Sequence, residues 1–247
     1  MREYHARLGR DPASPSIERT VRTNTALVPR RAETLLRVLE EVGGNGLVGK
    51  RVLEVGCGFG ALAGYLAWAG RPERVVATDI RPDFVEAAAS SARRIGVDDR
   101  LSVRVGDMRD LAALREDPFD LVIANNAFVY LPTASDMRQA LAQFRQVLKP
   151  DGRILLYHAN RWRLRDPFSQ DPIVHLLPPP LAEAVCRLTG WRHNHGRVRL
   201  VSAPHLVRML RRAAFADCKV IGFGRGANWT GVKRFFASFY IVAARLR

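Results

Sequence analysis

Three glycines within five positions mark the part of the chain best suited to hold an anionic, nucleotide-like ligand. Gly56, Gly58 and Gly60 come directly after the short apolar run at residues 52–55. A loop that leads from a strand into a helix N-terminus presents free backbone N–H groups to an anion, and glycine lets a ligand approach without a Cβ in the way. Alone, the loop also fits the G-x-G-x-x-A pattern of dinucleotide-binding enzymes, so it predicts a nucleotide-like ligand and leaves the cofactor open.

Carboxylates accompany this loop at the ends of the neighbouring apolar runs. Glu54 precedes the first glycine by two positions, Asp79 ends the run VVATD, and Asp107 ends the run RVGD. A carboxylate can accept hydrogen bonds from both hydroxyls of a ribose, or from an amino group. If each run is a strand of a parallel sheet, the carboxyl ends meet at one edge. The spacing therefore predicts a nucleoside-binding site at that edge.

Strands that alternate with helices would position this edge. The apolar runs predict strands at residues 51–55, 74–79, 101–107, 119–125 and 152–158. Helical periodicity predicts helices at residues 29–43, 61–70, 83–95 and 135–148, the last of them capped by Ser135. Two more strands would close the sheet, at residues 217–223 and 234–247. The alternation favours an α/β fold with a doubly wound, mostly parallel sheet and helices on both faces.

This set of residues, in this order and spacing, resembles the class I S-adenosylmethionine-dependent methyltransferase family over residues 47–157. The resemblance implies a Rossmann-like sheet of seven strands, whose last strand lies antiparallel between the fifth and the sixth. It implies S-adenosylmethionine as the cofactor and S-adenosylhomocysteine as the product. A nicotinamide-dependent dehydrogenase is a minor alternative, because the chain after Tyr157 is short and offers no further nucleotide fold.

The resemblance also assigns roles to single residues. Glu54 would receive the ammonium group of the cofactor, Asp79 the ribose hydroxyls and Asp107 the adenine amino group, while Ile80 and Met108 would sandwich the adenine ring. The predicted cofactor-binding residues are Glu54, Gly56, Cys57, Gly58, Gly60, Asp79, Ile80, Asp107, Met108 and Asn125.

The alternation of strands and helices stops after His158. Prolines become frequent between residues 159 and 200, where one helix is expected at residues 181–188, closed by Gly190. We therefore expect one domain with a lid. Its parts are an N-terminal helical cap (1–48), the cofactor-binding core (49–158), a substrate lid inserted after the fifth strand (159–200), and a C-terminal helix with the closing strand pair (201–247).

A sulfonium methyl group is already activated, so few catalytic side chains are expected. Alignment of the acceptor can be worth on the order of 7 to 11 kcal/mol. Asn125 is expected to orient the cofactor or the acceptor, and His158 to serve as general base for a hydroxyl. Tyr130 stands where many small-molecule members of the family have a histidine. His193 and His195 are interpreted as part of a solvated loop, and no metal site is predicted.

The positive charge is concentrated in the last third of the chain. The formal net charge is +15, and residues 153–247 carry +13 of it. Arginine supplies 35 of the 39 basic residues, which fits the codon bias of a GC-rich genome and a merely solvated surface. The alternative interpretation is that this third faces an anionic partner. In the predicted lid, Arg161, Arg163 and Arg165 would hold an acidic group or simply pack the lid onto the sheet.

The expected function is methylation of a hydroxyl on a small organic acceptor, such as a natural-product or glycan intermediate, which is anionic or lipid-linked. Oxygen is favoured over nitrogen and carbon on family frequency alone. An RNA methyltransferase and a non-catalytic binding subunit remain alternatives. RNA is less favoured because Asn125-Asn126-Ala127-Phe128 stands where an Asn-Pro-Pro-Tyr type run would indicate methylation of base amino groups.

Other features bound the cellular setting. No stretch resembles the apolar core of a signal peptide, and no uncharged stretch approaches the roughly 20 residues of a membrane span. The three cysteines are too scattered for a disulfide framework. These features predict a soluble, cytoplasmic protein, and its oligomeric state stays open, a homodimer included.

Overall fold

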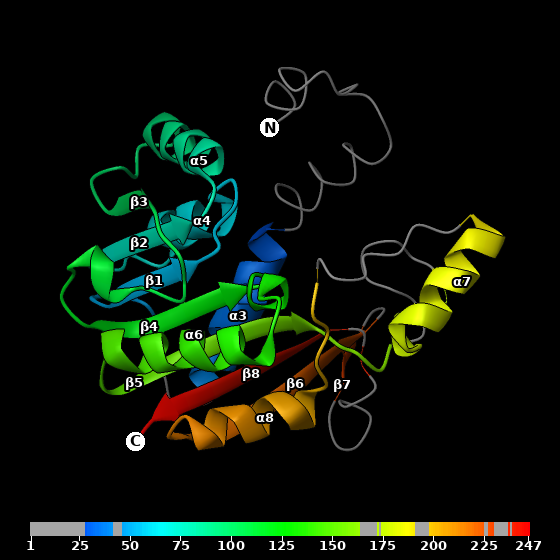
Figure 1. The fold of residues 1–247 in the computed structure, drawn as a ribbon. Coiled ribbons are helices and arrows are strands. Elements are labelled where there is room, and N and C mark those ends of the chain that lie inside the picture. Colours follow the sequence, from blue (N-terminus) through cyan, green and yellow to red (C-terminus); the bar gives the residue numbers. More distant parts are fainter. Residues whose placement is uncertain are drawn as a thin grey trace.

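One mixed sheet organises the molecule. The computed structural model describes residues 28–41, 46–163, 172, 174–190, 198–224, 227–229, 237 and 239–247. In this part of the chain the strand order is β3-β2-β1-β4-β5-β8-β6-β7 (Figure 1). The strands are β1 (Arg51–Val55), β2 (Arg74–Asp79), β3 (Leu101–Val105), β4 (Phe119–Asn125), β5 (Leu148–Ala159), β6 (Phe215–Gly224), β7 (Ala227–Trp229) and β8 (Phe239–Leu246).

The pairing of the strands confirms the predicted fold class. The pairs β1–β2, β1–β4, β2–β3 and β4–β5 are all parallel. Strand β8 pairs antiparallel with both β5 and β6, so the last strand lies between the fifth and the sixth, as the resemblance implies. The three-residue strand β7, which pairs with β6, was not predicted, since so short a run carries no periodicity of its own.

Helices cover both faces of the sheet (Figure 1). Helices α6 (Ala134–Val147) and α8 (Ala203–Arg212) pack on one face, and α3 (Val28–Glu41), α4 (Ala61–Ala69) and α5 (Pro82–Arg94) on the other. Strand alternation divides β1 between the two layers, because Leu53 and Val55 belong to the α6 side and Val52 to the α3 side. The short helices are η1 (Ala112–Leu114), η2 (Phe128–Tyr130) and η3 (Val174–Leu176), and α7 (Pro179–Thr189) stands beyond the end of β5.

Helix α6 begins one residue earlier than predicted, and its cap is Thr133 rather than Ser135. The Thr133 hydroxyl accepts a hydrogen bond from the backbone N–H of Asp136 at 3.0 Å, and the Asp136 carboxylate accepts one from the backbone N–H of Thr133 at 3.0 Å. This reciprocal arrangement satisfies two N–H groups that a helix start leaves free. Ser135 therefore lies inside the first turn.

The start of β5 also differs from its prediction. The sequence Lys149-Pro150-Asp151 predicts a turn before the strand, yet all three residues lie within β5. The pairing of β4 with β5 shifts register between Phe119 and Leu121, and Asp151 has a φ of 61°. The turn chemistry thus produces an irregularity inside the strand instead of a boundary.

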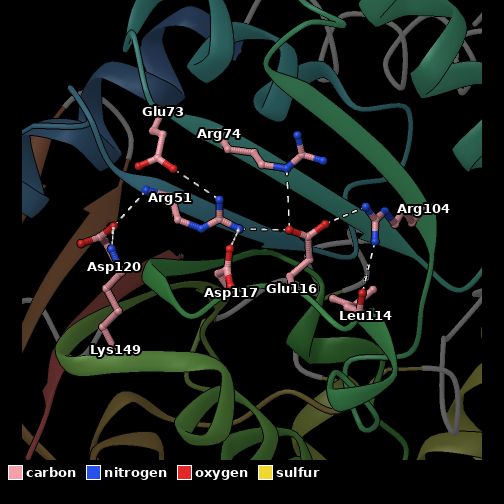
Figure 2. Close-up of polar contacts among 9 residues, drawn as sticks. All are labelled: Arg51, Glu73, Arg74, Arg104, Leu114, Glu116, Asp117, Asp120 and Lys149. Carbon is pink, nitrogen blue, oxygen red and sulfur yellow. Dashed lines mark hydrogen bonds and ion pairs between the residues drawn. The ribbon is translucent and has the colours of Figure 1, made fainter.

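An ion network centred on Glu116 joins β1, β2 and β3 (Figure 2). Glu116 pairs with Arg51 at 3.0 Å, with Arg104 at 2.6 Å and with Arg74 at 3.7 Å, and its side chain is only 10% exposed. These arginines belong to β1, β3 and β2, so one carboxylate ties three strands together. Arg51 and Arg74 lie at the amino ends of their strands, away from the carboxyl edge where ligands bind in such sheets, whereas Arg104 lies near the carboxyl end of β3.

The residues described by the structure include no helix that is both long and apolar enough to cross a bilayer.

Candidate functional site

Loops from the carboxyl ends of β1, β2, β3 and β4 meet at one edge of the sheet. The loop after β1 is tied to β2, since the backbone N–H of Cys57 donates to the carbonyl of Thr78 at 2.9 Å. The loop after β3 is tied to the same strand by a 3.0 Å hydrogen bond from the N–H of Gly106 to the carbonyl of Asp79. The structure thus brings the predicted loop residues together.

Two of the three loop glycines are required by packing. A Cβ on Gly56 would lie 2.3 Å from the Cβ of Ala127, and one on Gly60 would lie 2.7 Å from the Cβ of Ala88. Gly58 differs, because no atom of the described residues lies within 4 Å of the place its Cβ would take, although its φ is +54°. Gly58 therefore leaves open backbone where a ligand can approach, directly before the N-terminus of α4.

Glu54 supplies a buried carboxyl group beside this loop. Its side chain is almost wholly buried, and its Oε2 has no hydrogen-bond partner among the described residues. Burial raises the pKa of Glu54 to about 8, while a hydrogen bond with the Ala63 backbone and the charge of Arg31 oppose that rise. A buried acceptor without a donor is costly unless a ligand completes it. An ammonium group suits this position, and S-adenosylmethionine carries one.

Arg31 is a part of the site that sequence reasoning missed. It comes from α3, lies close enough to Glu54 to lower the pKa of that carboxyl, and places its guanidinium carbon 5.7 Å from the ring centroid of Tyr157. The residues around Arg31 in the sequence do not indicate this role, because Arg31 meets Glu54 and Tyr157 only in the folded chain. The N-terminal helix therefore adds a positive charge to the site.

Asp79 links the end of β2 to the glycine loop. Its Oδ2 accepts a hydrogen bond from the N–H of Gly58 at 2.8 Å, and its Oδ1 accepts one from the N–H of Arg81 at 3.0 Å. Each carboxylate oxygen has a second lone pair for a ligand hydroxyl. The next residue, Ile80, is 61% exposed, which leaves an apolar surface for a ring.

Asp107 is held by an arginine that was also missed. Both carboxylate oxygens of Asp107 accept hydrogen bonds from the guanidinium of Arg109, at 2.6 to 3.1 Å. Hydrogen bonding by Arg109 lowers the pKa of Asp107, so this carboxylate stays charged. Arg109 also bonds Asp136 of α6 at 2.8 Å, while Met108 packs against the core on that side. Arg109 thus fixes the orientation of the third carboxylate.

Two asparagines lie where β4 ends. Asn125 is paired in register with Tyr157 of β5, and the backbone N–H of Asn126 donates to the carbonyl of Tyr157 at 2.8 Å. The side-chain oxygens of both asparagines are buried and have no hydrogen-bond partner among the described residues. Asn126 has a φ of 56°, a backbone conformation that few residues besides glycine and asparagine adopt readily. Two unsatisfied amide oxygens can orient donors of a bound ligand.

Tyr130 and His158 differ sharply in exposure. Tyr130 lies in η2 and is 56% exposed, yet partial burial raises its pKa. His158 is fully buried, with its ring stacked on Tyr240 at 5.7 Å and its Nδ1 2.7 Å from the carbonyl of Ala159. Burial lowers the pKa of His158 to about 4, which weakens the case for it as a general base. Its assignment as a base stays an untested prediction.

Several predicted lid residues lie outside the described residues, namely Arg165, His193 and His195. Within the described part of the lid, the guanidinium carbon of Arg163 lies 5.2 Å from the ring centroid of Phe239, and Phe239 stacks on Tyr157 at 5.3 Å. The backbone N–H of Arg161 donates to the carbonyl of Val201 at 3.2 Å. These contacts anchor the beginning of the segment to β8 and to Val201, and the lid itself remains a prediction.

Comparison with known proteins supports the resemblance to methyltransferases. A family profile described as "Methyltransferase domain" matches residues 52–152. The chain is 35% identical over 136 residues to a ubiquinone biosynthesis O-methyltransferase of Xanthomonas euvesicatoria pv. vesicatoria, which covers 55% of this chain and 52% of the relative. It is 32% identical over 115 residues to the protein of that name from Xylella fastidiosa, covering 47% of this chain and 44% of the relative. The chain thus spans about half the length of these curated relatives.

Solved structures share the fold at low sequence identity. N-methyltransferase NodS from Bradyrhizobium japonicum, in complex with S-adenosyl-L-homocysteine, is similar with a TM-score of 0.60 and 18% identity over 98% of both chains. An O-methyltransferase family protein from Burkholderia thailandensis is similar with a TM-score of 0.58 and 16% identity over 91% of this chain and 58% of that one.

Proposed function

Because this chain belongs to the class I S-adenosylmethionine-dependent methyltransferase family, we propose that it transfers a methyl group from S-adenosylmethionine to a hydroxyl of a small organic acceptor. The observation that carries the proposal is the orphaned, buried carboxyl oxygen of Glu54 next to the open backbone at Gly58. A carboxyl group buried in this way suits a cationic ligand that approaches along a bare loop.

The residues present at the carboxyl edge fit each part of this cofactor. Glu54 binds the ammonium group, and Arg31, the positive charge beside it, binds the carboxylate of the same amino acid. Asp79 accepts from the ribose hydroxyls through the lone pairs that Gly58 and Arg81 leave free.

The adenine end of the site uses the next two loops. Asp107, fixed and kept charged by Arg109, accepts from the adenine amino group. Ile80 offers an exposed apolar side chain on the other loop, and Met108 contributes a polarizable sulfur. The glycine loop itself is held by the hydrogen bond from the Cys57 N–H to Thr78 and by the close packing of Gly56 and Gly60.

When bound, the cofactor supplies a methyl group on a positively charged sulfur, and the protein's task is to align an acceptor with it. Asn125 and Asn126 lie at the end of β4, where their unsatisfied side-chain oxygens can orient the acceptor hydroxyl. Good alignment alone can lower the barrier by on the order of 7 to 11 kcal/mol. Tyr130 borders the same loop, and with a raised pKa its hydroxyl stays protonated and acts as a hydrogen-bond donor.

The choice of oxygen as the methyl acceptor rests on sequence relatives. The curated relatives of 32% to 35% identity are named O-methyltransferases. Their names support a hydroxyl acceptor and a biosynthetic role for this chain. The acceptor is proposed to be small, and either anionic or lipid-linked.

Calorimetric titration with S-adenosylhomocysteine tests the cofactor site. Asp79→Ala is expected to weaken binding roughly 100-fold, because it removes two charge-assisted hydrogen bonds. Asp79→Asn, which keeps the shape of the side chain, separates loss of charge from disturbance of the Gly58 loop. Asp99→Ala serves as the matched control, because Asp99 is exposed and lies just before the amino end of β3. This variant is expected to bind S-adenosylhomocysteine normally. Unchanged affinity in both Asp79 variants would contradict the proposed site.

A screen with a radiolabelled methyl donor tests the reaction. Hydroxylated small molecules are expected to become labelled, and Asp79→Ala to abolish the labelling. Cofactor binding without transfer to any hydroxyl compound would favour a non-catalytic binding subunit. Transfer to RNA would favour the nucleic-acid alternative instead.

A further inference from the structure

Helix α8 presents a basic face to solvent. Its apolar side chains Leu206, Met209 and Leu210 are buried against the sheet, together with Ala203. On the opposite side, His205, Arg208, Arg211 and Arg212 are exposed. His205, Arg208 and Arg212 recur at helical spacing and therefore share one stripe of the helix. These four residues and Arg199, exposed in the preceding segment, are called the α8 basic face.

The charges of this face converge on one place. Burial lowers the pKa of His205, and the charges of Arg208, Arg199 and Arg212 lower it further. The guanidinium groups of three residues from two segments are therefore near a single imidazole. Residues 198–213 contain no aspartate or glutamate. In the part of the chain that the structure describes, no ion pair involves an arginine of the α8 basic face.

The absence of ion pairs on the α8 basic face, among the described residues, contrasts with the network around Glu116. There, Arg51, Arg74 and Arg104 all pair with Glu116 (Figure 2). Not every arginine of this protein is merely a solvated surface residue. Some arginines pair with a carboxylate inside the fold, whereas those of the α8 basic face have no ion-pair partner among the described residues. Uncompensated positive charge on one face attracts a polyanionic surface.

The α8 basic face reaches the candidate acceptor edge. The backbone N–H of Arg199 donates to the carbonyl of Val129 at 2.6 Å, and its guanidinium donates to the carbonyl of Pro132 at 3.4 Å. Both carbonyls flank Tyr130. Val201 forms a parallel bridge with Asn160, just past the end of β5, so α8 starts at the same edge (Figure 1). Arg199 therefore places one end of the α8 basic face next to the acceptor position. From there α8 runs toward the amino end of β5, since Phe215, which follows α8, pairs with Leu246, and Arg245 pairs with Arg153.

The chemistry of the face favours a lipid surface over nucleic acid. Helix α8 contains no phenylalanine, tyrosine or tryptophan on which bases could stack. Exposed leucines lie on η3 and α7 instead, beyond the end of β5, and the most exposed, Leu188, is 87% accessible. Exposed arginines with no ion-pair partner among the described residues fit the anionic headgroup region of a bilayer.

We propose that the α8 basic face docks this protein on a membrane surface that carries anionic lipids, with the Arg199 end of that face beside the acceptor edge. The proposal goes beyond methyl transfer, because it concerns where the enzyme meets its acceptor. It would hold for any acceptor delivered from a bilayer.

Sedimentation with lipid vesicles tests the docking surface. The full chain is expected to bind vesicles of phosphatidylcholine and phosphatidylglycerol in equal parts, and not vesicles of phosphatidylcholine alone. Arg208→Gln/Arg212→Gln should lower the affinity roughly 30-fold, since each arginine near such a surface contributes about a fivefold factor. Added salt should weaken wild-type binding.

Arg93→Gln/Arg94→Gln on α5 is the matched control, because it removes the same charge from another exposed helix end. It is expected to keep wild-type affinity for the vesicles. No binding to anionic vesicles, or an equal loss in both double variants, would overturn the proposal. So would binding of polyadenylate RNA with no binding of vesicles. Titration of both variants with S-adenosylhomocysteine separates this outcome from a failure of the proposed function, since the cofactor should bind either variant normally.

Discussion

At the residue scale, the proposed contact of Glu54 with the cofactor predicts that binding is coupled to proton release. Burial holds its pKa at about 8, so the carboxyl is mostly protonated at neutral pH in the free protein. An ammonium group favours the carboxylate, and binding at about pH 7 should therefore release up to about one proton. Affinity should rise as pH increases toward 8. Calorimetric titration in two buffers with different ionisation enthalpies measures the proton directly.

Glu54→Gln supplies the control for this linkage. The variant should bind S-adenosylhomocysteine more weakly, by roughly 10-fold or more, and without the Glu54 proton. If the wild-type binding enthalpy does not depend on the buffer, no proton is released on binding. The protonation state of Glu54 would then be the same in the free and the bound protein.

His158 should contribute to acid denaturation. Its pKa falls from an ordinary value of 6.5 to about 4 in the fold, so the unfolded chain takes up a proton first as pH drops. The stability associated with neutral His158 is thus present above pH 6.5 and is lost between 6.5 and 4, by about 3 kcal/mol in all. Urea unfolding at about pH 7 and about pH 5 measures this slope.

His158→Phe keeps an aromatic ring against Tyr240 but cannot take up a proton. Its stability should depend less on pH across that interval. If His158→Phe retained the full slope, another group would be responsible.

The residues that the sequence could predict share one property, which is their position at the end of an apolar run. Glu54, Asp79 and Asp107 meet because strand register converts spacing along the chain into a common edge. Arg31 and Arg109 could not be found in this way, since their contacts depend on how α3 and α6 pack on the sheet. His158 sits at a strand end, but side-chain alternation turns it into the core.

At the element scale, the start of α6 offers a direct comparison of two candidate caps. Thr133→Ala should cost about 1 kcal/mol of stability, because its hydroxyl accepts from the N–H of Asp136. Ser135→Ala should change stability little. Chemical denaturation of the two variants measures the difference, and a larger loss for Ser135→Ala would place the cap where the sequence pattern alone suggested it.

The ion network around Glu116 stabilises strand pairing. Glu116→Gln should destabilise the fold by roughly 3 kcal/mol, because it leaves a cluster of arginines without their common carboxylate. Glu73→Gln, whose side chain is 55% exposed, should cost less than about 1 kcal/mol. Cofactor affinity should stay unchanged in both variants, since neither Glu116 nor Glu73 belongs to the proposed cofactor site. Equal losses of stability in Glu116→Gln and Glu73→Gln would show that the buried ion pairs of Glu116 contribute no more than an exposed pair.

Elements with strong periodicity were predictable, and irregular ones were not. The core strands and the helices α3 to α6 follow from hydrophobic spacing, and the position of β8 between β5 and β6 follows from the family resemblance. The early start of β5 and the added strand β7 depend on register shifts and on pairing with β6, which no local pattern encodes.

At the scale of the whole molecule, charged side chains gather in three regions that differ in how their arginines are paired. The Glu116 network pairs its arginines internally, and the carboxyl edge gathers carboxylates with Arg31 and Arg109 around an open loop. The arginines of the α8 basic face have no ion-pair partner among the described residues. The sequence predicted the excess charge of the last third, but only the fold separates paired from unpaired arginines. The proposed cofactor site uses the second of these regions, and the proposed docking surface uses the third.

A crystal structure of the protein with S-adenosylhomocysteine tests the central claim most directly. The account predicts the ribose hydroxyls on the Asp79 carboxylate, the ammonium group on Oε2 of Glu54, and the adenine ring between Ile80 and Met108. A ligand bound away from the carboxyl edge, or this edge closed by the protein's own side chains in the presence of saturating ligand, would contradict it.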